Sequence, residues 1–147
     1  MNAPKFGVRL ASWDAAEAAL RRIRYDVFVV EQRVPEALEW DDADAQSIHA
    51  LAEDGAGAPI GCGRLLPTGY IGRMAVVAPW RGRGVGGALL LRLLELAREH
   101  GHPEVRLHAQ IDAVPFYARY GFAPVGATFV EVDIVHQTMR RPLTADR

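Results

Sequence analysis

Several features are scarce in this chain of 147 residues, and each absence narrows its function. The one cysteine, Cys62, cannot form an intrachain disulfide and leaves no multi-cysteine metal site. Residues 1–5 lack the apolar core of a signal peptide. No apolar run reaches the roughly 18–20 residues that cross a bilayer. We therefore predict a cytoplasmic protein with no bound metal and no membrane partner.

An excess of positive charge is also missing. The chain has 17 basic and 18 acidic residues, for a formal net charge of −1, which argues against nucleic-acid binding through bulk charge. Half of the residues are hydrophobic, and there are no internal repeats or low-complexity segments. This length and composition predict one globular domain spanning residues 1–147.

Turn residues and apolar periodicity predict the order β-α-β-β-β-α-β-α-β-β. The first helix begins after the N-cap Ser12 and runs to about Gln32, and residues 33–46 form a long acidic loop. The apolar face of that helix is predicted to comprise Ala15, Ala18, Ala19, Ile23, Val27 and Val30. The strands are predicted at 6–11, 47–53, 59–66, 70–77, 105–110, 122–126 and 129–140, and the later helices at 85–100 and 112–120. The pattern indicates an α/β (α+β) fold with a mixed sheet and helices on its faces.

A glycine-rich turn at residues 81–87, Arg-Gly-Arg-Gly-Val-Gly-Gly, joins a strand to a leucine-rich helix. It satisfies G-x-G-x-x-G, but a dinucleotide site needs the first crossover of a parallel sheet, whereas here an antiparallel meander precedes the turn. A P-loop is excluded because no Gly-Lys-Ser/Thr follows. A connection that only allows close packing would explain neither Arg81 nor Arg83.

The remaining interpretation is a diphosphate site. Glycines expose the backbone amides at a helix start, where the helix dipole adds positive charge. Two arginines can neutralise a diphosphate, and the preceding apolar strand can accommodate a flat, amide-bearing arm. Coenzyme A has both parts.

Two motifs resemble those of the GCN5-related N-acetyltransferase (GNAT) family. Residues 81–86 match the signature Arg/Gln-x-x-Gly-x-Gly/Ala, and residues 109–126, AQIDAVPFYARYGFAPVG, resemble the later landmark in which Phe-Tyr precedes Gly-Phe. Residues 27–51 are further similar to the bacterial ElaA/YjcF-like branch. The resemblance implies a single-domain GNAT fold, a mostly antiparallel sheet split at a central V-shaped slot, and an acetyl-CoA-dependent N-acetyltransferase.

The resemblance also implies roles for individual residues. The strand 73–77 bulges, and its backbone pairs with the pantetheine arm, the Val76 amide holding the thioester carbonyl. Tyr117 protonates the leaving thiolate, with Tyr120 as the alternative, and Gln110 replaces an asparagine that bonds the cofactor arm. The implied cofactor-binding residues are Met74, Ala75, Val76, Arg81, Gly82, Arg83, Gly84, Val85, Gly86, Gly87, Gln110 and Phe116.

The sequence does not decide which group acts as the general base. Glu31 at the end of the first helix and His136 on a late strand are the catalytic candidates beside Tyr117, while His108, His49 or a chain of waters are alternatives. The Gly-Cys-Gly context of Cys62 indicates a small buried residue, so we expect direct transfer in a ternary complex and no acetyl-cysteine.

The acceptor is a small-molecule or peptide amine that the sequence does not identify, and homodimerisation is open. The acidic residues of the segment 31–44 predict a negative field that favours ammonium acceptors, so neutralising Asp41 and Asp42 should raise the acceptor KM. A non-catalytic acyl-CoA-binding sensor of the same fold is the alternative function.

Overall fold

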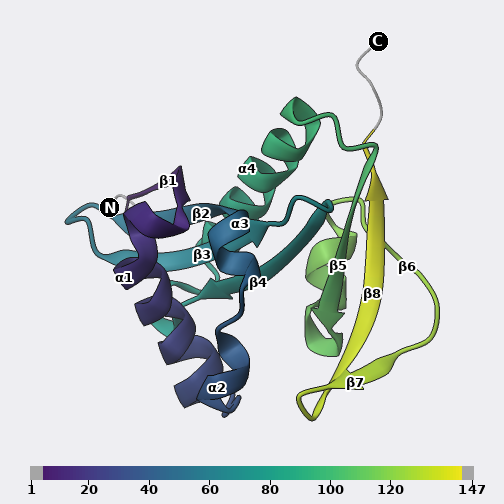
Figure 1. Cartoon of the computed structure of the whole chain (residues 1–147), viewed down its shortest axis with the longest axis horizontal. Coiled ribbons are helices and arrows are strands. Elements are labelled where there is room, and N and C mark those ends of the chain that lie inside the picture. The colour runs from purple at the N-terminus through teal and green to yellow at the C-terminus, as the bar shows by residue number, and fades with distance from the viewer. Residues whose placement is uncertain (1–4, 144–147) are drawn as a thin grey trace.

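Within residues 5–143, which the computed structural model describes, eight strands form one mixed sheet in the order β1-β2-β3-β4-β5-β8-β6, with β7 paired to β8 (Figure 1). The strands are β1 (Phe6–Ser12), β2 (Ile48–Asp54), β3 (Pro59–Leu65), β4 (Tyr70–Val76), β5 (Glu104–Gln110), β6 (Ala123–Pro124), β7 (Phe129–Glu131) and β8 (Ile134–Pro142). The α-helices are α1 (Trp13–Arg24), α2 (Glu36–Glu39), α3 (Ala43–Gln46), α4 (Val85–Glu99) and α5 (Val114–Ala118). A π-helical segment (Tyr25–Glu31) and two 3-10 turns (Ala78–Trp80 and Ile111–Ala113) complete the order.

Two antiparallel halves make up the sheet. Strands β1 to β4 form a meander, and β5, β8, β6 and β7 form the second half. The halves meet where β4 and β5 pair in parallel. The predicted α/β (α+β) class, with a mostly antiparallel sheet, is confirmed.

Helices pack on both faces of the first half. Helix α1 buries Leu20 and Ile23 against Leu51 of β2 on one face. Helix α4 buries a row of leucines that includes Leu89 and Leu93 against the other face. Each fully buried side chain of this size stabilises the fold by about 1.5–3 kcal/mol, so these two layers fix the strands that reach the slot.

The predicted start of the first helix is confirmed, since the Ser12 hydroxyl accepts a hydrogen bond from the Ala15 amide at 3.2 Å. The predicted apolar face is only partly correct. Ala15, Ala18 and Val30 are exposed, whereas the buried positions are Ala16, Leu20, Ile23, Val27 and Phe28. In α1 the buried face is the one that carries Leu20. From Tyr25 onward the chain is π-helical, and its wider turns move the following residues out of α-helical spacing.

Two other segments differ from the prediction. The loop 33–46 contains the single-turn helices α2 and α3. The predicted strand 129–140 is a hairpin of β7 and β8 that turns at Val132 (φ 50°) and Asp133 (φ 61°). Such left-handed hairpin turns are usually marked by Asn-Gly or Asp-Gly, and here Asp133 stands without a glycine, so the sequence carried only a weak turn signal. None of the helices described between residues 5 and 143 is long and apolar enough to cross a membrane.

Candidate functional site

Strands β4 and β5 separate soon after they meet. They pair only through Tyr70 with Arg106 and Ile71 with Leu107, and then diverge (Figure 1). A cavity of about 540 Å³ fills the divergence, between the two strands, the end of the π-helical segment and β8. This is the V-shaped slot that the family resemblance implied.

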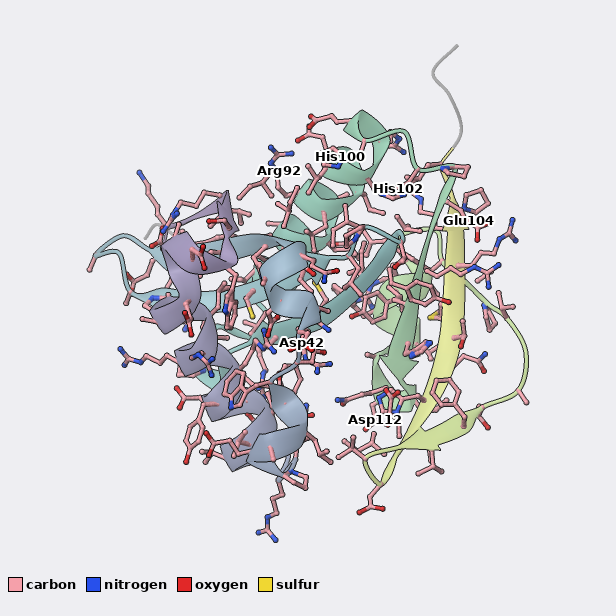
Figure 2. The ribbon with its side chains drawn as sticks, in the orientation of Figure 1. Asp42, Arg92, His100, His102, Glu104 and Asp112 are labelled. Carbon is pink, nitrogen blue, oxygen red and sulfur yellow. The ribbon has the colours of Figure 1, made fainter. Side chains whose placement is uncertain are left out.

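The cavity lies toward the carboxyl end of β5. Leu107, His108 and Gln110 line it, whereas Glu104 at the start of the strand does not. Figure 2 shows Glu104 and Asp112 at opposite ends of β5, with Asp112 near the end that borders the cavity. The cavity therefore extends beyond the residues through which β4 and β5 pair.

The peptide of Val76 faces into the slot. The next amide, that of Val77, donates to Ile60 of β3 at 3.0 Å, and alternate residues of a strand direct their amide and carbonyl to opposite sides. The Val76 carbonyl points away from β3, because it accepts a hydrogen bond from Arg81 Nε at 2.8 Å. The Val76 amide thus faces away from β3 as well, where it can donate to a bound carbonyl.

The glycine turn ends at the amino terminus of α4. Gly84 is the N-cap in the left-handed region (φ 86°), and the first intrahelical bond runs from the Ala88 amide to its carbonyl at 3.1 Å. The amides of the first helical residues, 85–87, therefore lack intrahelical partners, and the dipole of this 15-residue helix adds positive charge there. This arrangement can bind a diphosphate.

Both arginines of the turn are held by neighbours. Arg81 forms a salt bridge with Glu31 through hydrogen bonds of 2.6 and 2.7 Å. The Arg83 guanidinium lies over the Trp80 ring at 5.2 Å. The hydrogen bond from Arg81 lowers the pKa of Glu31, so Glu31 is a weaker base than an ordinary glutamate.

Gln110 bridges the slot. Its side-chain amide donates to the Gln32 side-chain oxygen at 2.8 Å, joining the end of β5 to the end of the first helical stretch. Sequence reasoning missed Gln32, because a glutamine just after a helix carries no distinctive pattern. The Gln110 side-chain oxygen is not used in this bridge and can accept a further hydrogen bond.

The aromatic residues of α5 pack together beside α4. Tyr117 lines the cavity and is 8% exposed, and burial raises its pKa to about 12. Phe116 packs against Tyr117 and Tyr120 and faces Gly86. A side chain at Gly87 would overlap the Tyr120 hydroxyl, so the last glycine of the turn is needed for helix packing.

His136 and His108 line the cavity on the β5–β8 side. His136 Nδ1 lies 2.7 Å from the Ile134 carbonyl, which can only accept, so Nδ1 carries the proton and Nε2 keeps a free lone pair. Glu131 lies 3.9 Å from His136 Nε2 and 3.9 Å from His108 Nδ1. His49 is buried elsewhere, bonded to the Asp44 carbonyl, and does not line the cavity.

The predicted site residues fall into two groups. One cavity brings together the three catalytic candidates and the predicted cofactor residues of β4, β5 and the first turn position. These cavity-lining residues are Glu31, Met74, Ala75, Val76, Arg81, Gln110, Tyr117 and His136. The rest of the turn, 82–87, and Phe116 lie outside the cavity lining.

A family model described as an acetyltransferase (GNAT) domain matches residues 13–143, which is most of the chain. The chain belongs to the GNAT acetyltransferase family. Its relatives include YjcF of Bacillus subtilis (strain 168), named an uncharacterized N-acetyltransferase, which is 35% identical over 123 residues and covers 81% of this chain and 87% of that protein. The predicted family is thereby confirmed.

Solved structures show the same GNAT fold. An acyl-CoA N-acyltransferase from Pseudomonas aeruginosa matches with a TM-score of 0.83 and 32% identity, covering 93% of this chain and 99% of that one. Escherichia coli ElaA matches with a TM-score of 0.81 and 30% identity, covering 92% and 99%. The ElaA/YjcF-like resemblance of residues 27–51 therefore extends over nearly the whole chain.

In this GNAT domain, Cys62 is buried and its thiol donates to the Arg73 carbonyl at 3.4 Å. Burial raises its pKa to about 12, so little thiolate exists at neutral pH. An acetyl-cysteine intermediate needs that thiolate, and the geometry gives Cys62 a packing role.

The acidic segment of this GNAT domain differs from the sequence prediction of a negative field. Glu39, Asp41 and Asp44 are paired with three arginines that come from α1, β3 and β4. The pairs are Arg24 with Glu39 and Asp44, Arg64 with Asp41 and Asp44, and Arg73 with Glu39 and Asp41. Their charges cancel, so these three carboxylates do not give the slot a net negative charge. The sequence does not reveal these pairs, because the three arginines lie on separate elements that only folding brings together.

Proposed function

We propose that this chain transfers an acetyl group from acetyl-CoA to a primary amine by direct attack in a ternary complex. One observation carries the proposal: the Val76 amide faces the slot, within the same cavity as the buried hydroxyl-bearing Tyr117. Membership of the GNAT family makes acyl-CoA the expected donor.

The residues fit coenzyme A at both ends of the site. The pantetheine arm runs along the backbone of β4, and the diphosphate lies at the amides of residues 85–87, beside Arg81 and Arg83. Arg81 leaves Glu31 and the Val76 carbonyl to reach the phosphates, which frees that carbonyl for the amides of the arm. Within residues 5–143 no group of three or more His, Cys, Asp or Glu side chains could hold a metal ion.

Each step of the reaction has a residue in the cavity. The Val76 amide donates to the thioester carbonyl oxygen and stabilises the charge that develops there as the amine nitrogen attacks. His136 Nε2 takes the proton that the amine loses when the carbon–nitrogen bond forms. Tyr117 gives its proton to the sulfur as the carbon–sulfur bond breaks, since a phenol with its pKa raised to about 12 remains protonated at neutral pH.

His136 is the better base of the two catalytic candidates. Both Glu31 oxygens accept hydrogen bonds from Arg81, whereas His136 Nε2 has a free lone pair facing the cavity. The Glu131 carboxylate, 3.9 Å away, stabilises the imidazolium that forms. Replacement of His136 by Gln removes this lone pair and should lower kcat by the contribution of a general base, on the order of 10²–10⁴-fold.

The test combines binding with turnover. Acetyl-CoA should raise the melting temperature, because a ligand that prefers the native state stabilises it, and the shift should shrink with added salt. Free thiol should then be released when a panel of primary amines is added. An unchanged melting temperature at saturating acetyl-CoA would refute the proposal, and a shift without thiol release from any amine would favour the non-catalytic sensor.

A further inference from the structure

The slot strand β4 contains a bulge at Arg73. Its register with β3 shifts between Cys62 and Arg64, which pair with Ala75 and Gly72, so Arg73 and Met74 together oppose one residue. Arg73 adopts φ 51°, in the left-handed region that residues other than glycine rarely occupy. This bulge lies between the last pairing with β5 at Ile71 and the Val76 peptide, so it sets the direction in which β4 leaves its neighbour.

The side chain of Arg73 is held across the acidic segment. Its Nε lies 3.0 Å from the Glu39 carboxylate, and its Nη2 donates to the Glu39 carbonyl at 3.1 Å and to Asp41 at 3.2 Å. Its carbonyl accepts from the Cys62 thiol. Both the backbone and the side chain of the strained residue therefore have fixed partners.

The carboxylates that hold Arg73 are themselves fixed. Arg24, fully buried, donates to Glu39 at 2.8 Å and to Asp44 at 2.7 Å. Arg64 donates to Asp41 and Asp44 at 2.8 Å each. Glu39, Asp44 and Arg24 are buried, and buried side chains held by several partners keep one geometry, unlike an isolated surface ion pair.

We propose that Arg73 is a positioning residue for acyl transfer, whose side chain, clamped by Glu39 and Asp41, holds the β4 bulge and thereby aims the Val76 amide. This inference rests on the proposed function of that amide. It also assigns a role to the acidic segment, which anchors the catalytic strand instead of attracting the acceptor.

Substitution of Arg73 by glycine separates the effect of backbone strain from the effect of the side-chain contacts. Arg73→Gly permits φ 51° without strain but removes the clamp, whereas Arg73→Ala lacks the clamp and keeps the strain. Arg9→Gly is the matched control, because it removes an arginine from β1 that pairs with Glu53 at 2.9 Å, outside the slot. Both Arg73 variants should retain the parent far-ultraviolet circular dichroism spectrum, with Arg73→Gly melting above Arg73→Ala.

The expected result is a split between chemistry and binding. Arg73→Gly should lower kcat about 10- to 100-fold, since displacement of a positioning group by about 1 Å can cost that much. The Kd for coenzyme A, measured by calorimetry, should change less than threefold because the turn 81–87 is untouched. Arg9→Gly should change neither value. A kcat for Arg73→Gly within twofold of the parent would overturn the proposal.

A second measurement needs no turnover. In ¹⁵N-labelled protein without ligand, the Val76 amide resonance should move in Arg73→Gly and stay in place in Arg9→Gly. An unmoved Val76 resonance in Arg73→Gly refutes the clamp even if no amine is ever acetylated. Failure of the parent to release thiol, with a moved resonance, refutes the proposed function and leaves the clamp supported.

Discussion

Arg81 and Glu31 are joined by two hydrogen bonds, of 2.6 and 2.7 Å, across the mouth of the slot. The same guanidinium donates to the Val76 carbonyl. The residue that the family signature assigns to the phosphates is thus engaged with the slot strand and the first helical stretch. Under the proposed function, cofactor binding replaces these contacts.

Glu31→Gln should therefore tighten coenzyme A binding. The pair is nearly half exposed, and exposed ion pairs contribute about 0–1 kcal/mol, so the Kd should fall about two- to fivefold. Calorimetry with coenzyme A measures the change. Glu53→Gln, which breaks the exposed pair with Arg9, controls for the loss of one negative charge. Weaker binding by Glu31→Gln would mean that Glu31 assists the cofactor instead of competing with it.

Gly84→Val should abolish cofactor binding through backbone strain. Gly84 has φ 86° and open space where a Cβ atom would lie, so the fold has room for valine, but the left-handed conformation penalises a β-branched residue. The N-cap would change shape and redirect the amides of residues 85–87. Titration with coenzyme A by calorimetry checks this.

Gly57→Val is the matched control for that experiment. Gly57 has φ 85° and equally open surroundings, but it lies in the turn between β2 and β3. Both variants should lose similar stability, about 1–2 kcal/mol, whereas only Gly84→Val should lose coenzyme A binding. Equal affinity of the two variants for coenzyme A would show that the turn 81–87 is not part of the cofactor site.

Tyr117→Phe should lower turnover more than binding. Under the proposed function the hydroxyl acts when sulfur leaves, and an acid catalyst contributes on the order of 10²–10⁴-fold. Because burial raises the pKa of Tyr117 to about 12, the parent should keep this proton donor at every pH up to about 10. Steady-state kinetics of Tyr117→Phe and of Tyr120→Phe show which of the two hydroxyls is needed for turnover. A normal rate for Tyr117→Phe and a reduced rate for Tyr120→Phe would transfer the role to Tyr120.

The sequence predicted the fold well because the sheet depends on local patterns. Turn residues at 54–57 and 67–69 separated β2, β3 and β4 correctly, and the turn 81–87 located both the slot strand and α4. The hairpin at Val132 was missed because its left-handed turn has neither Asn nor Gly. The cavity-lining residues Val76, Arg81 and Tyr117 could be named from motifs, since the family landmarks lie on segments that border the cavity.

Long-range charge pairing was the part that sequence could not supply. Arg24, Arg64 and Arg73 lie on three separate elements, and only folding brings them to Glu39, Asp41 and Asp44. A count of acidic residues in the segment therefore predicted a negative field, whereas the carboxylates of Glu31, Glu39, Asp41 and Asp44 are each paired with an arginine. The same limit applies to the salt bridge between Arg81 and Glu31, whose partners are 50 residues apart.

Asp41→Asn separates the two interpretations of the acidic segment. The sequence interpretation predicts a higher acceptor KM, whereas the clamp predicts a lower kcat and little change in acceptor KM. The variant should also be less stable by about 1 kcal/mol at neutral pH, a modest value because the Asp41 side chain is 38% exposed and Arg64 keeps its bond to Asp44.

The pH dependence of that stability difference has a definite sign. Hydrogen bonding from Arg64 lowers the pKa of Asp41 from 3.8 to about 2. A carboxyl whose pKa is lower in the folded state stabilises fully above its unfolded value and loses that contribution as the pH falls through its folded value. The difference in free energy of unfolding between the parent and Asp41→Asn should thus be constant above about pH 5 and shrink toward pH 2. Urea unfolding at pH 7, 4 and 3 measures it, and a difference that grows on acidification would show that the carboxylate of Asp41 is not held by Arg64 in solution.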